Sequence, residues 1–570
     1  MTDLREQTWA RLGNETFDLV VIGAGVIGSA AARDAVLRGL KVAVLDANDT
    51  AAGTSSRSSK LVHGGLRYLE QREFSLVFES VSERKVLLEI APHLVRPMGF
   101  LFPIYPESPV TVPKLRLGLM VYEGLALFRS PRRHRTLSAR EACQQMPQLR
   151  SQGLKGAPLY WDCMTDDARL TLETLLDAHG HGAAALTYGR VVGLLRDEHG
   201  RVGGVTVQDG LDPAAEPRRV DVRARAVINA TGPWSDRVRG LSQPGSSQLR
   251  CTKGVHIVVP ADRLHLEHVV VGTHPVDKRM LFVMPWGDMV YIGTTDTDYE
   301  GNPREVAASA EDVAYLLEAV NAFFPTVKLQ PADVTSTWAG LRPLIRADGL
   351  APSEVSREHV ITVDPDGLIS IAGGKLTTCR RMGAEVVQRA IDWMKLAGRG
   401  DVEAAVVDTG RLPLPGAVGW PDDDEDGSSV AGLVVEAAEG RLPPETCKYL
   451  TDRYGTRAID LVRLAGADQG LLEPLVPGRP EIMAQVDWAV KHELALTVTD
   501  FMERRTQLFF RDRNQGLDAV DKVADRMALL LGWSPARRDA SADQYRGEVA
   551  MSRRWRLPST ATGQGGPARG

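Results

Sequence analysis

The chain has few cysteines, little net charge and no long apolar run, and each of these features argues against one class of protein. Its 570 residues contain five cysteines, with no C-x-x-C pair among them. This pattern supports neither a disulfide framework nor a zinc or iron–sulfur site, and it suits a reducing compartment. The formal net charge of −5 is small for this length and gives no general reason to expect a nucleic-acid partner.

Apolar segments are equally limited. No uncharged apolar run approaches the roughly 20 residues needed to cross a bilayer. The N-terminal stretch Met1–Phe17 is polar overall and contains Asp3, Glu6 and Glu15, which is unlike a signal peptide. We therefore expect a cytoplasmic protein, or one that lies on a membrane without crossing it.

A glycine-rich turn near the N-terminus is the strongest local motif. Its parts are a strand at Phe17–Ile22, the turn Gly23-Ala24-Gly25-Val26-Ile27-Gly28, a helix at Val26–Arg38 and a second strand at Lys41–Leu45. The glycines permit a tight turn and a close approach of the backbone to a pyrophosphate, which the helix N-terminus favours. Asp46, at the end of the second strand, can accept a hydrogen bond from a ribose hydroxyl. These features together predict a βαβ unit that binds a dinucleotide.

Both NAD and FAD use such a turn, and two further features favour FAD. Two later strands are also followed by glycine-containing turns, at Thr231–Gly232 and at Gly373–Gly374, called here the glycine returns. A long cofactor that needs a second binding site on the protein is expected to use such turns. No second G-x-G-x-x-G is visible, so a separate nicotinamide dinucleotide site is not expected. A flavin enzyme without such a site passes its electrons to a quinone, to oxygen or to a carrier protein.

The predicted fold class is α/β. We expect a Rossmann-like FAD-binding domain of the glutathione-reductase or D-amino-acid-oxidase kind, with an inserted antiparallel-sheet substrate domain and an α-helical C-terminal domain. Strand-rich stretches such as Gly254–Val259 indicate the insertion, and helical periodicity over Pro444–Trp533 indicates the C-terminal domain. The predicted boundaries are 17–410 for the oxidoreductase region (FAD-binding parts 17–98, 162–245 and 335–400; substrate parts 99–161 and 246–334), 411–430 for a linker, 431–550 for the helical domain and 551–570 for a disordered tail.

Motifs along nearly the whole chain resemble those of one family. They are GAGVIGSAAARDAVLRGLKVAVLDA, AGTSSRSSKLVHGGLRYLE, APHL, DDARL, INATGPW, KGVHIVVP, FVMPWGD, IGTTDTDY, AGLRPL, SREH and AGGKLTT. In this order and spacing the chain resembles the FAD-dependent glycerol-3-phosphate dehydrogenases, and EIMAQVDWAVKHELALTVTDFMERRTQLFF resembles their C-terminal domain. The resemblance implies oxidation of sn-glycerol 3-phosphate to dihydroxyacetone phosphate by hydride transfer to FAD. It also implies a membrane quinone as electron acceptor in glycerol catabolism.

Cationic residues in these motifs suit a phosphate monoester, which is close to a dianion. By resemblance, Arg342 and Arg357 hold the phosphate, and Lys375 contacts the substrate and balances charge on the reduced flavin. Arg67 and Tyr68 close the pocket. Taken singly, each cation is more often part of a structural ion pair, and only the matched motifs favour the substrate role.

Oxidation of the C2 alcohol requires a group that takes the hydroxyl proton while the hydride goes to the flavin. His256 is the first candidate for this base, because imidazole titrates near the working pH. His63 is the second, and contact with the flavin is its other possible role. A hydrogen-bonded core histidine is the alternative interpretation of His256. Arg342 and Lys375 complete the predicted catalytic set.

The residues expected to bind FAD come from the glycine turn, the loop after the second strand and the two glycine returns. In the family that loop runs along the flavin, and its hydroxyl groups suit an extended cofactor with phosphates. The predicted set is Gly23, Ala24, Gly25, Gly28, Asp46, Ser55, Ser56, Lys60, His63, Thr231, Gly232, Gly373, Gly374, Leu376 and Thr377. No metal site is expected.

The segment Lys114–Phe128 (KLRLGLMVYEGLALF) is apolar with a basic start, and Arg129, Arg132, Arg133 and Arg135 follow it. Such a segment suits a helix in the headgroup region of an anionic membrane leaflet, and a core helix with a basic end is the alternative. The resemblance favours the membrane, since the family acts at the inner face of the cell membrane. The expected location is therefore cytoplasmic and peripheral to that membrane.

Several readings stay open. The nearest is a glycerol-3-phosphate oxidase, which shares these motifs and passes electrons to oxygen. An amino-acid or sarcosine oxidase relative shares the flavin fold but does not need Arg342, Arg357 and Lys375 together. An FAD-binding regulator without turnover and a soluble NAD-linked dehydrogenase are less favoured. The quinone type, the oligomeric state and the role of the C-terminal domain, with a homodimer contact or a regulatory surface as options, are not determined.

Overall fold

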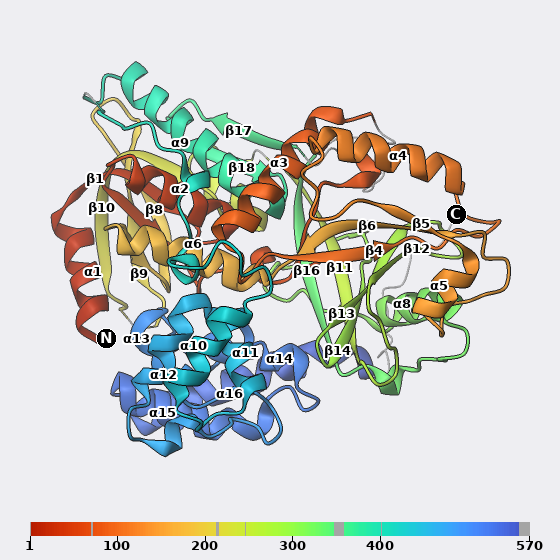
Figure 1. Cartoon of the computed structure of the whole chain (residues 1–570). Coiled ribbons are helices and arrows are strands. Elements are labelled where there is room, and N and C mark those ends of the chain that lie inside the picture. The colour runs from red at the N-terminus through yellow and green to blue at the C-terminus, as the bar shows by residue number, and fades with distance from the viewer. Residues whose placement is uncertain are drawn as a thin grey trace, which may run out of the picture.

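A computed structural model describes residues 2–69, 72–211, 216–245, 247–346, 358–400 and 402–557. Figure 1 shows three parts: one sheet on the left, a second sheet on the right, and a group of helices from the C-terminal part of the chain below the first sheet. The active-site residues expected from the sequence lie mainly where the first sheet meets the second.

The first sheet is mixed, with the strand order β17-β18-β10-β1-β2-β7 and an added meander in which β8 pairs with β9 and β9 with β10. The four strands β18, β10, β1 and β2 run parallel to their neighbours in this order. The strand bounds are β1 Thr16–Ile22, β2 Val42–Leu45, β7 Ala184–Leu186, β8 Gly189–Arg196, β9 Val202–Asp209, β10 Arg219–Asn229, β17 His359–Val363 and β18 Ile369–Gly373.

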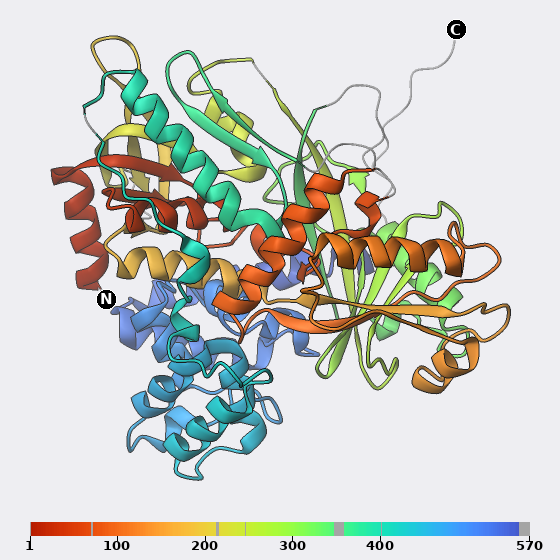
Figure 2. The same cartoon turned by 45° about the horizontal axis from the view of Figure 1, so that its top comes forward.

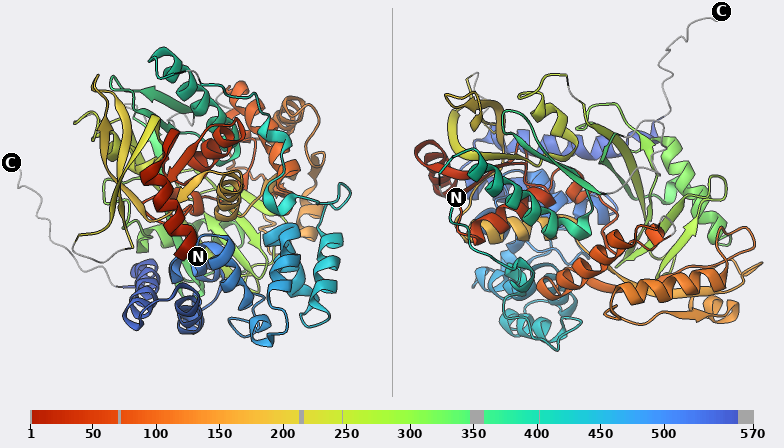
Figure 3. Two further views of the ribbon diagram at one scale, coloured as in Figure 1. Left: turned by 90° about the vertical axis from the view of Figure 1, so that its left-hand side faces the viewer. Right: turned by 90° about the horizontal axis from the view of Figure 1, so that it is seen from above.

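Helices α2 (Val26–Leu37), α6 (Asp167–Gly180) and α9 (Cys379–Leu396) share a buried core with one face of this sheet. The opposite face packs on the β8–β10 meander and on α1 (Thr2–Asn14), which Figure 3 shows beside these strands. Because both faces of the parallel strands are covered, β1 and β2 consist almost entirely of apolar residues. This arrangement confirms the predicted βαβ unit.

The second sheet has the order β15-β11-β14-β13-β12-β4-β6-β3, with β16 paired to β11 and β5 to β6. All of its pairings are antiparallel except that between β12 and β4. The bounds are β3 Leu61–Val62, β4 Arg96–Leu101, β5 Arg135–Leu137, β6 Ala157–Met164, β11 Leu249–Pro260, β12 Val269–Thr273, β13 Met280–Trp286, β14 Met289–Gly293, β15 Thr297–Asp298 and β16 Ser336–Ile345.

Helices α5 (Ala139–Gln145) and α8 (Ala310–Phe323) share a core with one face of the second sheet. The other face packs against α4 (Val112–Leu125) and the C-terminal helices. Helix α3 (Phe74–Ile90) contacts α4, and Figures 1 and 2 both show the two side by side at the rim of this sheet. The described residues contain no helix that is both long and apolar enough to span a membrane.

The C-terminal part is helical, as predicted. Its helices are α10 Ser428–Ala438, α11 Pro444–Tyr454, α12 Ala458–Leu464, α13 Ala484–His492, α14 Leu508–Arg511, α15 Val520–Leu531 and α16 Pro535–Ser552, with a π-helical turn at Asp500–Arg505. Short 3₁₀ turns and one short helix complete the fold: η1 Thr54–Ser56, η2 Leu66–Leu69, η3 Gly232–Trp234, α7 Ser235–Arg239, η4 Pro331–Asp333, η5 Leu376–Thr378, η6 Thr409–Arg411, η7 Pro415–Ala417, η8 Gly455–Arg457, η9 Gln469–Leu472, η11 Leu517–Ala519 and η12 Arg554–Arg556.

Two segments differ from the boundaries that the sequence suggested. Residues 411–430, predicted to form a linker, include the 3₁₀ turn η7, and Leu414 and Ala417 in this segment are buried. Residues 551–557 were predicted to belong to a disordered tail, but Trp555 packs into the core of the second sheet. Residues 558–570 lie outside the described residues. In both cases a few apolar side chains in a polar stretch order the backbone.

Candidate active site

The carboxyl ends of four neighbouring parallel strands bring the predicted cofactor residues to one edge of the first sheet. The register pairs Ile22 with Leu45 and with Asn229, and Asn229 with Ser370. The glycine turn, Asp46, the Thr231–Gly232 return and the Gly373–Gly374 return therefore follow adjacent strand ends. Ligands of open α/β sheets bind at this edge.

The glycine turn is closed by backbone contacts that leave no room for side chains. A Cβ on Gly28 would lie 1.8 Å from the carbonyl oxygen of Gly23, and Gly23 itself has a φ of +104°. The next residue, Ala24, is buried. Helix α2 begins at Val26 with Gly25 as its N-cap, which has no side chain to cap the helix. The first turn of α2 thus points its N–H groups toward the sheet edge, where a pyrophosphate fits.

Two predicted side chains meet this turn from the loop after β2. The Ser55 hydroxyl accepts a hydrogen bond from the Val26 N–H at 2.9 Å, and the Asp46 carboxylate accepts one from the Ala24 N–H at 2.7 Å. Asp46 also accepts from the Asn48 N–H at 2.8 Å. Burial raises the pKa of Asp46 to about 6, against these two hydrogen bonds, which favour its charged form. Both side chains therefore contact the backbone at or just before the start of α2.

Two other predicted cofactor residues are buried and make polar contacts with the protein itself. The Ser56 side chain is buried and its hydroxyl faces the Gly53 carbonyl of its own loop. The Lys60 ammonium is buried, 2.6 Å from the Asp167 carboxylate and 3.1 Å from the Ser56 carbonyl oxygen. A buried ammonium that is neutralised by a buried carboxylate is a structural ion pair. This placement argues against the predicted contact of Lys60 with FAD.

The two glycine returns are joined to each other by Asn229. Its side-chain amide donates to the Ser370 hydroxyl at 3.2 Å, and its carbonyl oxygen accepts from the Thr231 hydroxyl at 2.7 Å. Gly232, Gly373 and Gly374 all have positive φ values, which favour glycine. A Cβ on Gly374 would also lie 2.1 Å from the Met382 side chain.

One cluster of predicted residues surrounds the loop that follows β3. The His63 N–H donates to the Thr377 hydroxyl at 3.1 Å, and that hydroxyl donates to the His63 carbonyl at 3.2 Å. The Lys375 ammonium lies 3.8 Å from the centre of the Tyr68 ring and 3.4 Å from the Ser80 hydroxyl. Leu376, between Lys375 and Thr377, is partly buried against the core beside α3.

The pKa of His63 is lowered. Burial is the main cause, and the Lys375 ammonium adds to it, against the opposite effect of the Asp162 carboxylate. His63 is therefore a neutral imidazole near pH 7. His63 lies near the predicted substrate residue Lys375, whose charge contributes to the shift of its pKa.

A second cluster lies on the paired strands β11 and β16. His256 is 1% exposed, its ring stacks on Trp338 at 4.7 Å, and its Nε2 lies 3.0 Å from the Ser59 hydroxyl. Its Nδ1 has no hydrogen-bond partner within the part of the chain that the structure describes. Burial, with the charges of Arg342 and Lys60, lowers the pKa of His256 well below its usual value.

Arg342 is held beside His256 by the loop after β14. Its guanidinium donates to the Asp296 carboxylate at 3.1 Å, to the Thr294 hydroxyl at 3.1 Å and to the Thr295 carbonyl oxygen at 3.3 Å. It also lies against Gly254, where a Cβ would come within 2.5 Å of Nη2. The side chain is 25% exposed and therefore reaches the surface of the site.

Two predicted substrate residues are not placed by the structure. Arg357 lies outside the described residues, and for Arg67 only the backbone, within η2, is described. Several residues in contact with the site were not predicted: Ser59, Ser80, Tyr122, Thr294 and Asp296. Ser59, Thr294 and Asp296 lie within the motifs quoted above, so the resemblance could have indicated them as site residues. In the described residues no group of His, Cys, Asp or Glu side chains could hold a metal ion.

Comparison with known proteins agrees with this geometry. Residues 18–389 match the family described as FAD dependent oxidoreductase, and residues 407–538 match the C-terminal domain of alpha-glycerophosphate oxidase. The fold and the sheet-edge site thus define an FAD-dependent oxidoreductase. The cofactor fits the residues present, because the turn leaves no room for side chains at Gly23 and Gly28 and α2 begins at the same edge of the sheet.

Relatives of similar length narrow the assignment. Glycerol-3-phosphate dehydrogenase 2 of Mycobacterium tuberculosis is 39% identical, over 96% of this chain and 90% of its own. The aerobic glycerol-3-phosphate dehydrogenase of Staphylococcus haemolyticus is 36% identical, over 94% of each chain. The crystal structure of a glycerol-3-phosphate dehydrogenase from Bacillus halodurans with FAD is 30% identical and superposes with a TM-score of 0.78, over 96% of this chain and 97% of that one. The chain belongs to the FAD-dependent glycerol-3-phosphate dehydrogenase family.

Proposed function

We propose that this protein oxidises sn-glycerol 3-phosphate to dihydroxyacetone phosphate and passes the electrons to a quinone at the inner face of the cell membrane, in glycerol catabolism. The names of its relatives support the substrate. Bound FAD supplies the redox chemistry by accepting a hydride from the substrate's C2 carbon. The protein's own residues bind the phosphate, orient the C2 hydroxyl and take its proton.

The observation that supports this reaction most is that His256 on β11 and Arg342 on the adjacent strand β16 lie near enough for the charge of Arg342 to add to burial in lowering the pKa of His256. Arg342 presents a rigid guanidinium at the surface of the site, held by three contacts with the loop Thr294–Asp296. An arginine fork binds a phosphate dianion in two parallel hydrogen bonds. Together with Lys375, Arg67, Tyr68 and Arg357, this residue would fix the phosphate end of the substrate.

His256 would serve as the proton acceptor through Ser59. Its ring is buried, so a substrate reaches it more directly through the half-buried Ser59 hydroxyl, 3.0 Å from Nε2. In this proposal the C2 hydroxyl gives its proton to the Ser59 oxygen while the Ser59 proton moves to His256 Nε2. The lowered pKa of His256 keeps its imidazole neutral near pH 7, with one ring nitrogen that can accept a proton, and the same shift makes it a weaker base than a free histidine. His63, beside Lys375, is the second candidate for the base.

A surface formed by α3, α4 and the residues after α4, called here the α3–α4 surface, supports the membrane proposal. Its exposed apolar side chains are Phe74, Phe78, Leu117, Met120, Val121, Leu127 and Phe128, of which Phe128 is 73% exposed. Basic residues next to it, among them Arg116, Arg129 and Arg133, are exposed as well. Exposed apolar patches with cationic rims suit the headgroup region of an anionic leaflet.

An anaerobic titration tests the reaction and the acceptor together. The purified holoenzyme should lose its flavin absorbance on addition of glycerol 3-phosphate and should regain it rapidly with a soluble quinone analogue. Loss of absorbance with glycerol but not with glycerol 3-phosphate would contradict the role of the phosphate. Reoxidation by quinone no faster than by oxygen would contradict the proposed acceptor.

A second candidate, a glycerol-3-phosphate oxidase, is favoured by one observation. Residues 407–538 match the C-terminal domain of alpha-glycerophosphate oxidase. In that case oxygen would reoxidise the flavin and each turnover would release one peroxide. The yield of peroxide per dihydroxyacetone phosphate, with and without the quinone analogue, separates the two.

A further inference from the structure

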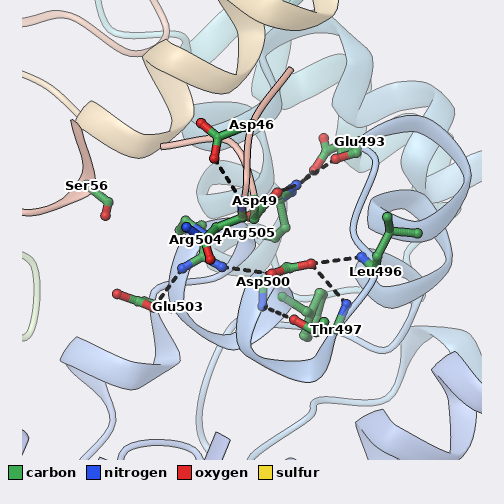
Figure 4. A network of polar contacts seen from close by, with 12 residues as sticks. Asp46, Asp49, Ser56, Glu493, Leu496, Thr497, Asp500, Glu503, Arg504 and Arg505 are labelled. Atoms are coloured by element: carbon green, nitrogen blue, oxygen red, sulfur yellow. Dashed lines mark hydrogen bonds and ion pairs between the residues drawn. The ribbon is translucent and has the colours of Figure 1, made fainter. Parts of the chain in front are cut away.

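Asp49, three residues beyond Asp46, is held by two successive arginines of the C-terminal domain (Figure 4). Arg504 Nε donates to Oδ2 at 2.6 Å, Arg505 Nη1 to the same oxygen at 2.7 Å and Arg505 Nη2 to Oδ1 at 2.9 Å. Asp49 is fully buried. Burial alone would raise the pKa of Asp49, but the two guanidiniums outweigh it and the pKa lies below the usual value.

The two arginines that share this carboxylate lie in the π-helical turn Asp500–Arg505. Every residue of this turn is buried, and π-helical turns occur often at functional sites. The turn therefore holds two buried arginines against Asp49 in the loop after β2.

The same turn also holds the second chain segment beside Asp46. Asp500 Oδ1 accepts a hydrogen bond from the Tyr188 hydroxyl at 2.5 Å and from Arg504 Nη2 at 2.8 Å. Tyr188 in turn pairs its backbone N–H with the Asn48 carbonyl at 3.0 Å, and the N–H of the next residue, Gly189, donates to the Asp46 carbonyl at 2.7 Å. The loop after β2 and the start of β8 are thus bound to one another and to the C-terminal domain.

The loop after β2 and the C-terminal domain are not closely packed along their whole contact. A cavity of about 260 Å³ lies where the loop, the C-terminal domain and other parts of the fold meet; its lining includes Asn48 and Arg57 of the loop, Glu503 and Glu548 of the domain, and Trp234, Arg304 and Leu341. A polar contact crosses beside it, from Arg57 Nη2 to Glu503 Oε1 at 3.3 Å. Polar contacts with the C-terminal domain therefore help to hold the loop in position.

We propose that Arg504, Arg505 and Asp500 are positioning residues for FAD, through which the C-terminal domain holds Asp46 toward the ribose of the cofactor. Buried ion pairs add little net stability compared with apolar packing, but they impose one geometry on the groups they join. Here the geometry imposed is that of the segment Asp46–Asp49, which also contacts the glycine turn through Ala24. The proposal rests on the role proposed for Asp46 and assigns the C-terminal domain a function in cofactor binding.

The affinity of the deflavinated full-length protein for FAD tests this. Arg505→Lys keeps the charge and removes the fork, and Tyr188→Phe removes only the hydroxyl that binds Asp500. Arg526→Lys is the matched control, because Arg526 makes two hydrogen bonds to Asp487 within the C-terminal domain, at 2.6 and 2.9 Å. We expect the dissociation constant for FAD, followed by flavin fluorescence, to rise at least tenfold in Arg505→Lys and several-fold in Tyr188→Phe.

The control should keep the wild-type FAD affinity within about twofold, even though its unfolding temperature falls. Amide hydrogen exchange in residues 46–50 of the apoprotein should also be faster in Arg505→Lys than in the control. Equal FAD affinities for Arg505→Lys, Tyr188→Phe and the control would overturn the proposal. If Arg505→Lys does not fold, the comparison of Tyr188→Phe with the control still decides. Bleaching of the flavin by glycerol 3-phosphate is a separate measurement, so failure of the proposed reaction is distinguishable from failure of this inference.

Discussion

The hydroxyl of Tyr122 on α4 accepts a hydrogen bond from the backbone N–H of Gly64, in the loop after β3, at 2.8 Å. The same hydroxyl donates to the Asp162 carboxylate, which is ion-paired with the buried Arg84. A Cβ on Gly64 would come within 2.3 Å of the Tyr122 oxygen. The loop that leads to Tyr68 is therefore packed directly on the inner face of α4, whose outer face forms part of the α3–α4 surface.

Replacing Tyr122 with Phe should weaken substrate binding without loss of FAD. The change leaves the buried Gly64 N–H without its closest acceptor, which costs about 1–3 kcal/mol. We expect the KM for glycerol 3-phosphate to rise roughly tenfold, because the loop that carries Tyr68 loses its anchor. Steady-state kinetics and the flavin content measure the two effects.

Tyr105→Phe is the control for that variant. It removes another buried hydroxyl contact, to the Arg150 carbonyl oxygen at 2.8 Å, in a part of the second sheet away from the loop after β3. It should lower stability and leave KM unchanged. A rise in KM of the same size in both variants would show that the effect is general destabilisation.

His256→Asn should slow flavin reduction by roughly 10²-fold or more at neutral pH, because the base is lost. Ser59→Ala should slow it as well, since the proposed proton path passes through the Ser59 hydroxyl 3.0 Å from the ring. Stopped-flow measurement of the absorbance change after mixing with glycerol 3-phosphate gives both rates. An unchanged rate in His256→Asn would transfer the role of base to His63.

The stability of the protein should fall as the pH falls below about 6.5, the ordinary pKa of histidine. The pKa of His256 is depressed in the folded state by burial and by nearby cations. Below about pH 6.5 this residue therefore binds a proton in the unfolded chain but not in the folded chain. The free energy of unfolding then decreases with falling pH by at most about 1.4 kcal/mol per pH unit from this residue. Denaturant unfolding at pH 7.5 and 5.5 should show a smaller difference in His256→Asn than in the wild type; an identical difference would exclude this source.

The Lys60–Asp167 pair gives a prediction about stability alone. Asp167→Asn leaves a buried ammonium without its carboxylate, and we expect a loss of about 3–5 kcal/mol. The double variant Lys60→Met, Asp167→Leu should recover most of it, because apolar residues of similar volume often replace a buried pair without loss. Urea unfolding measures both. If the double variant binds FAD with unchanged affinity, Lys60 has no direct part in cofactor binding.

The α3–α4 surface should bind anionic vesicles. In Leu117→Glu, which places a charge on a side chain that is 61% exposed, co-sedimentation with vesicles containing phosphatidylglycerol should fall several-fold while activity with a soluble quinone analogue persists. Leu529→Glu is the matched control, because Leu529 is 73% exposed on α15 in the C-terminal domain. Equal vesicle binding by both variants would contradict the proposed membrane contact.

The sequence alone determined the nucleotide-binding half and the family. The turn from Gly23 to Gly28 and the acid at Asp46 are local features, because their geometry depends on residues that are close in the chain. The chemistry of imidazole suggested His256 and the resemblance suggested Arg342 and Lys375, whereas the structure shows that burial and Arg342 lower the pKa of His256 and that Lys375 lies over the Tyr68 ring.

Only the tertiary structure decided how those residues are supported. The sequence predicted that Lys60, in a polar loop, contacts the cofactor. In the structure its ammonium is paired with the carboxylate of Asp167, which is 107 residues later in the chain. The arginines that hold Asp49 lie more than 450 residues beyond it, with separations of 455 and 456. No local pattern links such partners, because a buried charge is stabilised by whichever opposite charge the fold brings within hydrogen-bond distance, and that choice belongs to the packing of whole domains.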